Sequence, residues 1–185
     1  MYKTFKYLFL IYLFIGCQNS VDVNDIKNID NLAYLNNKVF TGIAVDLDEN
    51  ENVRVKVSYK DGIKILTELF YPSGKTQSEW KYGLSQISVK RFYKSGKLES
   101  EETFDKKLVR NGLSKSYYKN GRLKREWNFK NGVRNGIQKN YYGDGSISDE
   151  TETKNGVQNG YMRIYSRDGR LEKEVYYKEG TQIKI

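Results

Sequence analysis

Glycine recurs at a nearly constant interval along residues 70–185 of this 185-residue chain. Successive members of the series are 22, 25, 24 and 24 residues apart, each shortly after an aromatic residue and five positions before a Glu. They are Gly74, Gly96, Gly121, Gly145 and Gly169. Self-similarity at such a period is the mark of a repeat protein. We therefore predict five copies of one unit of ~24 residues.

The turn dipeptides indicate that each unit is a tight β-hairpin. Asn120-Gly121, Asp144-Gly145 and Asp168-Gly169 accept positive φ at both central positions of a type I′ turn. Asn131-Gly132 and Asn155-Gly156 have the same chemistry between units. The predicted fold is all-β, an elongated antiparallel meander of tandem hairpins that forms one single-layer twisted sheet.

Opposite charges favour one register for these hairpins. If Asn120-Gly121 is a two-residue turn, Lys115 lies opposite Glu126. The same rule gives three further pairs, Lys90 with Glu101, Lys139 with Glu150, and Arg163 with Glu174. The first unit is the exception, because Glu68 faces Glu79 there. In this register the recurring Glu, Lys and Arg are scaffold residues rather than catalytic ones.

A second register stays open. A three-residue turn with a glycine bulge would bring Tyr117 opposite Leu123. The recurrent tyrosines have two interpretations under either register: they cover the sheet, or they form an interface, because aromatic side chains are favoured interface anchors. The candidate interface residues are Tyr93, Tyr117, Tyr118, Tyr141, Tyr142 and Tyr165.

The N-terminus has the pattern of an export signal. Lys3 and Lys6 precede an apolar run over residues 7–15, which suits a secretory signal peptide and is too short to span a bilayer. Phe14-Ile15-Gly16-Cys17 resembles the lipobox of bacterial lipoproteins, although Leu is commoner at the position of Phe14. The resemblance implies that Cys17 is acylated and holds the protein in the cell envelope. A plain signal peptide and an uncleaved anchor are the alternatives.

In a bacterium with two membranes, Gln18 favours the outer membrane over the inner one. The predicted domains are a lipoprotein signal peptide (1–16), an Asn/Asp-rich tether (17–33), degenerate hairpins (34–69) and the five repeats (70–185). The acidic residues between Asp46 and Glu51 have the Asp-x-Asp spacing of a calcium loop. They lack its glycine and its distal Glu, so a solvated hairpin tip is favoured.

One complete unit carries a family resemblance. Residues 117–126, Tyr-Tyr-Lys-Asn-Gly-Arg-Leu-Lys-Arg-Glu, continue through Phe129-Lys130-Asn131-Gly132 to Asn135-Gly136. This pattern resembles the MORN repeat variant of YwqK-type antitoxins, and residues 39–44, Val-Phe-Thr-Gly-Ile-Ala, are similar to the Tyr-Thr-Gly start of such arrays. The resemblance implies a repeat scaffold and a toxin as partner.

The composition argues against catalysis. The chain has no His and one Cys, so it lacks the parts of a Ser-His-Asp or Cys-His centre and of most zinc sites. We predict a protein that is not an enzyme, needs no cofactor or metal, and has no specific nucleic acid as partner. The net charge of +9 is spread along the repeats and interleaved with Glu.

Three functions stay open from the sequence. The favoured one is an envelope-tethered protein that binds a protein partner, either a toxin or an envelope protein. The second is adsorption of a basic face to an anionic membrane or polymer. The third is a passive structural lipoprotein in which the repeats act as a spacer.

Overall fold

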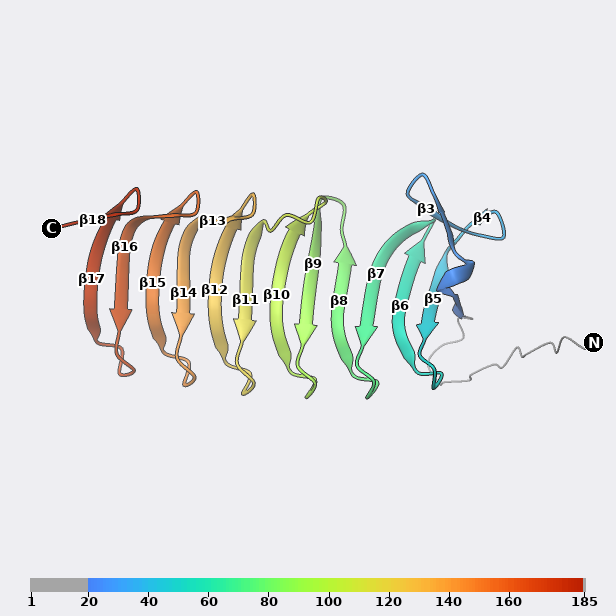
Figure 1. The fold of residues 1–185 in the computed structure, drawn as a ribbon, viewed down its shortest axis with the longest axis horizontal. Coiled ribbons are helices and arrows are strands. Elements are labelled where there is room, and N and C mark those ends of the chain that lie inside the picture. Colours follow the sequence, from blue (N-terminus) through green and yellow to red (C-terminus); the bar gives the residue numbers. More distant parts are fainter. Residues whose placement is uncertain (1–19, 185) are drawn as a thin grey trace, which may run out of the picture.

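The computed structural model describes residues 20–184, and the predicted signal peptide and Cys17 lie outside this range. The chain forms a 15-stranded sheet that runs along the long axis of the molecule, and a separate three-stranded sheet at its N-terminal end (Figure 1). The N-terminal elements are β1 (Ser20–Asp22), η1 (Val23–Asp25), β2 (Lys27–Ile29), β3 (Leu32–Leu35), β4 (Lys38–Val39), β5 (Gly42–Leu47) and β6 (Val53–Lys60). The remaining strands are β7 (Ile63–Phe70), β8 (Thr76–Tyr82), β9 (Gln86–Phe92), β10 (Leu98–Asp105), β11 (Gly112–Tyr117), β12 (Leu123–Lys130), β13 (Val133–Arg134), β14 (Gly136–Tyr141), β15 (Ile147–Lys154), β16 (Val157–Tyr165), β17 (Leu171–Lys178) and β18 (Thr181–Ile183).

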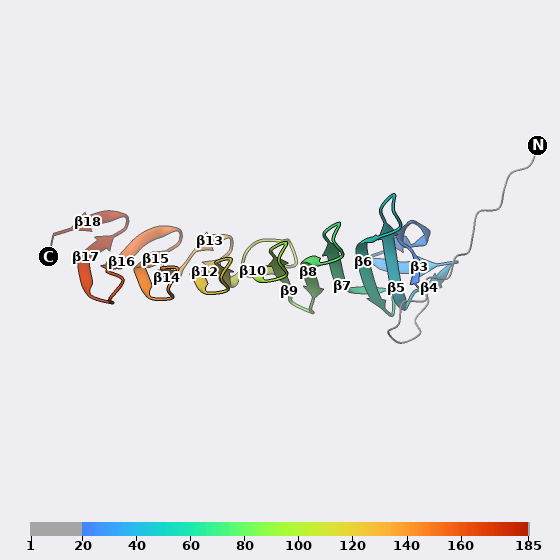
Figure 2. The same ribbon diagram turned by 90° about the horizontal axis from the view of Figure 1, so that it is seen from below.

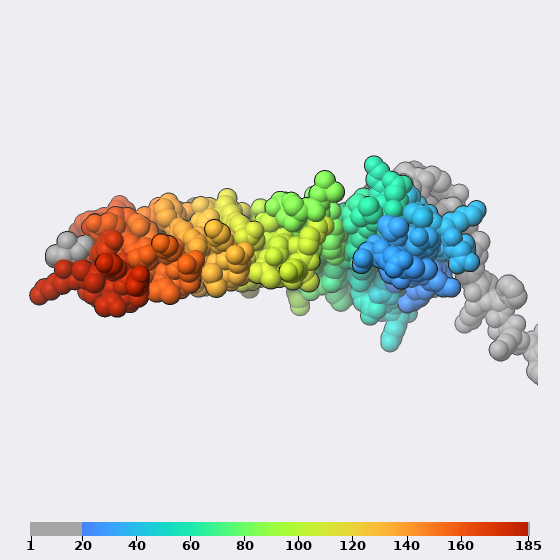
Figure 3. Space-filling model, turned by 90° about the horizontal axis from the view of Figure 1, so that it is seen from above, coloured from blue at the N-terminus to red at the C-terminus, as the bar shows by residue number. Residues whose placement is uncertain are grey.

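The all-β antiparallel meander is confirmed. Strands from β5 to β18 pair in chain order, apart from the short β13, which lies beside β12. Seen along the sheet edge, the hairpins are bowed, and no second layer covers β7 to β17 (Figure 2). The space-filling view shows a rod that is thicker at its N-terminal end (Figure 3).

The N-terminal end departs from the prediction in two ways. β1 pairs with β5 in parallel, which makes the sheet mixed. The prediction of a tether over 17–33 is wrong for its described part, because residues 20–33 form β1, η1, β2 and the start of β3. Ala33 is fully buried in a core with Phe40, Ala44 and Val57. The apolar residues of this segment are isolated among Asn and Asp, so the sequence shows no alternation that would predict a strand.

The hairpin turns combine both registers that the sequence left open. In the third unit Lys115 lies opposite Glu126, whereas Tyr117 lies opposite Leu123. One extra residue between the two pairs forms a bulge, and the same shift occurs beside the turn in the other four predicted units. The charge-paired register thus holds along the strand and the bulged register holds at its end.

The type I′ prediction is wrong for the turns within units and right for those between them. Only Gly121 of the Asn120-Gly121 pair has a positive φ, of 94°. The Gly121 N–H donates to the carbonyl oxygen of Tyr118 at 2.8 Å, so the glycine closes a longer, bulged turn. Between units, Asn131 and Gly132 have φ values of 50° and 83°, as a type I′ turn requires.

A sixth hairpin with the same turn precedes the five that were predicted. In β5–β6 the Asp48 N–H donates to Asn52, and the Glu51 N–H donates to Asp48, both through backbone carbonyl oxygens. Glu51 takes the place of the turn glycine, with a φ of 62°. The acidic stretch is therefore a hairpin tip, and the predicted degenerate region contains a complete unit.

Candidate binding surface

Eleven charged residues form one continuous row across the sheet. Each lies directly opposite the next on the neighbouring strand, from β6 to β17. The charged row consists of Lys56, Glu68, Glu79, Lys90, Glu101, Lys115, Glu126, Lys139, Glu150, Arg163 and Glu174. It contains all eight predicted scaffold residues. Neighbours alternate in sign except at Glu68 and Glu79.

The charged row stabilises the sheet and is nearly neutral overall. Lys139 Nζ is 2.8 Å from Glu150, and Arg163 Nε is 2.6 Å from Glu174. The hydrogen bond that Lys139 donates to the Glu150 carboxylate raises the pKa of Lys139 above its usual range. Cross-strand pairs of this kind contribute about 0.2–1 kcal/mol each. Because cations and carboxylates cancel along the row, this face does not select for an anion.

The second tyrosine of each turn connects one unit to the next. The phenol of Tyr93 donates to the carbonyl oxygen of Tyr117 at 2.6 Å. Tyr71, Tyr118 and Tyr142 make the same bond to the following unit, at 2.7, 2.6 and 2.8 Å. Three of the candidate interface residues, Tyr93, Tyr118 and Tyr142, thus have a structural role.

The other three candidate tyrosines are half-buried beside the charged row. The phenol oxygens of Tyr117 and Tyr165 lie 3.4 Å from Glu101 and Glu150. Burial raises the pKa of Tyr117, Tyr141 and Tyr165, and a nearby carboxylate of the row raises each further. The tyrosines therefore cover the sheet in this structure, and none projects as a free anchor.

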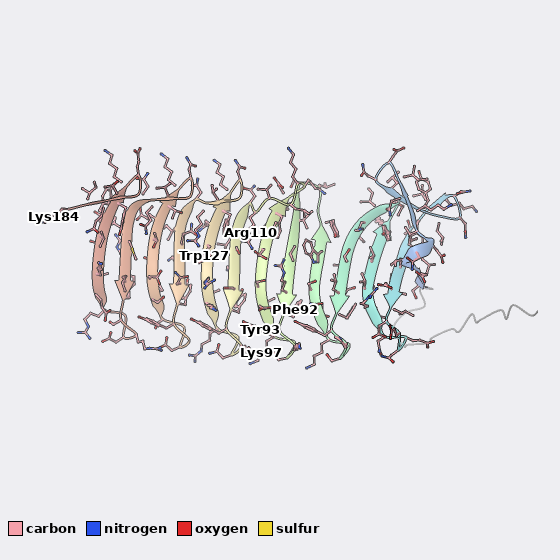
Figure 4. The ribbon with its side chains drawn as sticks, viewed as in Figure 1. Phe92, Tyr93, Lys97, Arg110, Trp127 and Lys184 are labelled. Atoms are coloured by element: carbon pink, nitrogen blue, oxygen red, sulfur yellow. The ribbon has the colours of Figure 1, made fainter. Side chains whose placement is uncertain are left out.

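The five predicted turn glycines all lie at hairpin tips on one long edge of the sheet, the lower edge in Figure 1. A basic depression of about 470 Å³ lies beside these glycines, at the turns of the first three predicted units. Lys94, Lys97 and Lys119 line it together with Tyr71 and Tyr93. Figure 4 shows Tyr93 and Lys97 at this edge.

The face opposite the charged row, which we call the packed face, contains most of the buried side chains. Val89 is fully buried, and Glu102 and Gln138 are 7% and 3% exposed. Gln138 donates hydrogen bonds to the Asn128 carbonyl and to Thr153 Oγ1, so its polar atoms have partners. No other layer covers this face over β7 to β17 (Figure 2). Its side chains are therefore buried by their neighbours on the same face.

A hollow of about 420 Å³ opens in the middle of the packed face, over β9 to β12. Most of its lining residues belong to β10, β11 and β12, and three of them are serines. We call it the Arg–Trp groove, lined by Arg91, Ser100, Ser114, Ser116, Arg125 and Trp127. The three serines stand where adjacent strands carry large side chains, which explains the depression.

Arginine and aromatic side chains surround this groove. Glu102 forms ion pairs with both Arg91 and Arg110, the second at 2.6 Å. Arg125 and Arg134 lie over the Trp127 ring, with the guanidinium carbon 4.9 and 4.0 Å from the ring centre. Figure 4 shows Trp127 in the middle of β12 and Arg110 near the opposite edge from the turns.

Two negative findings hold for the described residues, one on metal binding and one on membrane-spanning helices. In residues 20–184 no group of three or more Cys, Asp, Glu or His side chains is placed to hold a metal ion. Over the same range no helix is long and apolar enough to cross a membrane.

Comparison with known families identifies the repeated hairpin. Residues 87–106, 110–131 and 158–179 match the model of the MORN repeat variant. The chain contains MORN repeat variants. The matched MORN segments span β9–β10, β11–β12 and β16–β17, one hairpin each. No curated protein matches the chain.

The Arg–Trp groove is what sequence reasoning missed. The predicted interface consisted of tyrosines, which recur at the turns and serve the stacking of units. The groove residues recur only in part: the position of Trp127 is occupied by Trp80 in the first unit, by Glu102 in the second and by Thr151 in the fourth. A search for large departures from the repeat at positions next to the charged row would have found it.

Proposed function

We propose that this protein is a non-catalytic, envelope-tethered repeat protein that binds a protein partner. The carrying observation is the Arg–Trp groove on an otherwise uncovered sheet. Trp and Arg are the residue types that contribute most to protein interfaces when they cluster near the centre of a contact. The repeats supply a rigid support for the groove, because its strands β9 to β12 are each hydrogen-bonded to a neighbour on both sides.

The resemblance to YwqK-type antitoxins supports a finer proposal. On this reading the partner is a toxin, and the protein acts as an antitoxin or immunity component. The lipobox-like Phe14-Ile15-Gly16-Cys17 supports a lipid anchor in the bacterial envelope, at the outer membrane in a two-membrane bacterium. Neither proposal requires catalysis, since binding alone blocks a toxin.

The anchor has its own test. In the bacterium of origin the wild-type chain should fractionate with membranes, and its N-terminal peptide should carry acyl chains on Cys17 by mass spectrometry. Cys17→Ser should leave the protein with the signal peptide attached and without acyl chains. An unmodified Cys17 in the wild-type protein would contradict the lipoprotein proposal and leave the partner proposal unaffected.

The second candidate function is adsorption to an anionic membrane or envelope polymer. It is favoured by the basic depression with Lys94, Lys97 and Lys119. A structural lipoprotein would use this edge as a charged contact and the repeats as a spacer.

Salt separates the two functions. We expect a protein partner captured with the full-length chain, without cross-linking, to remain bound after washing at about 1 M salt, where electrostatic interactions are screened within about 3 Å. Binding to vesicles that contain phosphatidylglycerol should be lost in the same wash. Strong vesicle binding at low salt, with no protein retained at high salt, would overturn the partner proposal in favour of adsorption.

A further inference from the structure

We infer that the Arg–Trp groove recognises an acidic, extended segment of about four residues on the protein partner. This inference rests on the proposed function and adds the chemistry of the bound segment. The length follows from geometry, because β9 to β12 cover three interstrand spacings, or about 14 Å, and an extended chain advances about 3.3 Å per residue.

The charge of the groove is the first reason. Four arginines lie in or beside it, Arg91, Arg110, Arg125 and Arg134. Two carboxylates line it, Glu99 and Glu102, and of these two Glu102 forms ion pairs with Arg91 and Arg110. Among the described residues, Arg125 and Arg134 have no ion-pair partner. The groove therefore has an excess of positive charge that carboxylates on a partner would neutralise.

The geometry of these arginines is the second reason. The guanidinium groups of Arg125 and Arg134 lie over the Trp127 ring, which holds them through a cation–π contact. Stacking on a ring leaves the N–H groups at the guanidinium edge free, and these match a carboxylate through two parallel hydrogen bonds. The side chains are thus oriented before the ligand arrives, which lowers the entropic cost of binding.

The floor of the groove is the third reason. Ser116 Oγ is buried and has no hydrogen-bond partner within residues 20–184. A buried polar atom without a hydrogen-bond partner is unfavourable. Rotation of the Ser116 side chain would bring this oxygen to the groove surface, where a backbone N–H or carbonyl group of an extended segment would satisfy it.

The extent of the basic surface favours a peptide over a polyanion. Beyond the groove the same face continues with the neutral Gln138 and Thr151 towards the C-terminus, and with Val89 towards the N-terminus. Next to Arg125 and Asn140 lies Asp149, which is hydrogen-bonded to the Asn140 amide at 2.6 Å. A nucleic acid or a membrane surface would require cations along the whole face.

Tryptophan fluorescence provides the test, because the chain has two Trp and one of them lines the groove. The full-length protein is titrated with a blocked tetraglutamate peptide, and with a tetralysine peptide of the same length as control. Arg125→Gln combined with Arg134→Gln removes the free cations. Lys97→Gln combined with Arg122→Gln removes the same charge from the turn edge and serves as the matched control.

We expect tetraglutamate to change the fluorescence with saturation and tetralysine to have no effect. The groove variant should weaken the affinity about tenfold or more, since hydrogen bonds to charged groups are lost. The turn-edge variant should change it less than about twofold, because neither Lys97 nor Arg122 lines the groove and exposed charge is screened by salt. Circular dichroism shows whether both variants keep the fold.

Equal weakening in the two variants would overturn the inference, as would the absence of tetraglutamate binding to the wild-type protein. Tighter binding of a single-stranded oligonucleotide or of phosphatidylglycerol vesicles, lost in the groove variant, would replace the peptide with a polyanion. If tetraglutamate fails while a protein partner still survives the high-salt wash, the inference fails and the proposed function stands. If neither binds, both fail.

Discussion

The phenol of Tyr118 donates a hydrogen bond of 2.6 Å to the backbone carbonyl oxygen of Tyr141, one unit further along the sheet. This bond joins two turns that are adjacent in space and have no ladder hydrogen bonds of their own to each other. It recurs at every junction between the five predicted units. Ser166 occupies the same position in the fifth.

Tyr118→Phe should therefore lower the free energy of unfolding by about 1 kcal/mol, the net contribution of one such hydrogen bond. Urea unfolding followed by circular dichroism measures the change. Tyr165→Phe is the matched control, because its phenol oxygen makes only a long 3.4 Å contact with Glu150. Equal losses in the two variants would show that the bond between units has no special role.

A turn glycine and a glycine inside a strand should differ in their sensitivity to alanine. A Cβ at Gly169 would meet nothing within 4 Å, so Gly169→Ala is unfavourable mainly through its φ of 82°, by about 1–2 kcal/mol. A Cβ at Gly160, which has a φ of 123°, would lie 2.8 Å from the Cβ of Glu152. Gly160→Ala should destabilise the protein more than Gly169→Ala in the same unfolding assay. The opposite order would contradict the packing described for β15 and β16.

Stability should fall steeply in alkaline solution. The pKa of Lys139 is raised mainly by its hydrogen bond with Glu150, and burial raises the pKa values of Tyr117 and Tyr141. Groups whose pKa is higher in the folded state stabilise it fully below the unfolded pKa, which is about 10 for Tyr and about 10.4 for Lys. This stabilisation is lost as the pH rises through the folded values.

The expected result is a melting temperature that declines above about pH 10, the ordinary range of tyrosine titration. Tyr141→Phe should make the decline shallower, because this residue no longer ionises on unfolding. A pH-independent melting temperature between pH 9 and pH 11 would rule out the raised pKa values.

The features that were predictable from the sequence are local. A turn glycine and the cross-strand pair Lys115 and Glu126 lie within one hairpin, so spacing and charge alone determine their register. The hairpin β5–β6 was not predicted to belong to the repeat series, because Glu51 stands where the other units have glycine. The folded part of the expected tether escaped because Ala33 and Phe40 are buried by β5 and β6, which no local pattern indicates.

The groove depends on four strands at once. Ser100, Ser116 and Arg125 are adjacent only after two successive pairings are in register, and a bulge near each turn shifts the count. A sequence period reports what all units share, whereas the combination of Arg125 with these serines occurs in one place. Its position could be derived only from the assembled sheet.

The most direct test of a partner-binding sheet is capture of the full-length chain from cells without cross-linking, a wash at about 1 M salt, and identification of the proteins that remain bound. Three forms are compared: the wild type, the groove variant (Arg125→Gln with Arg134→Gln) and the turn-edge variant (Lys97→Gln with Arg122→Gln). The account predicts one protein retained by the wild type and the turn-edge variant, and lost from the groove variant. It would be contradicted if no protein survived the wash in any form while vesicle binding at low salt depended on Lys97 and Arg122.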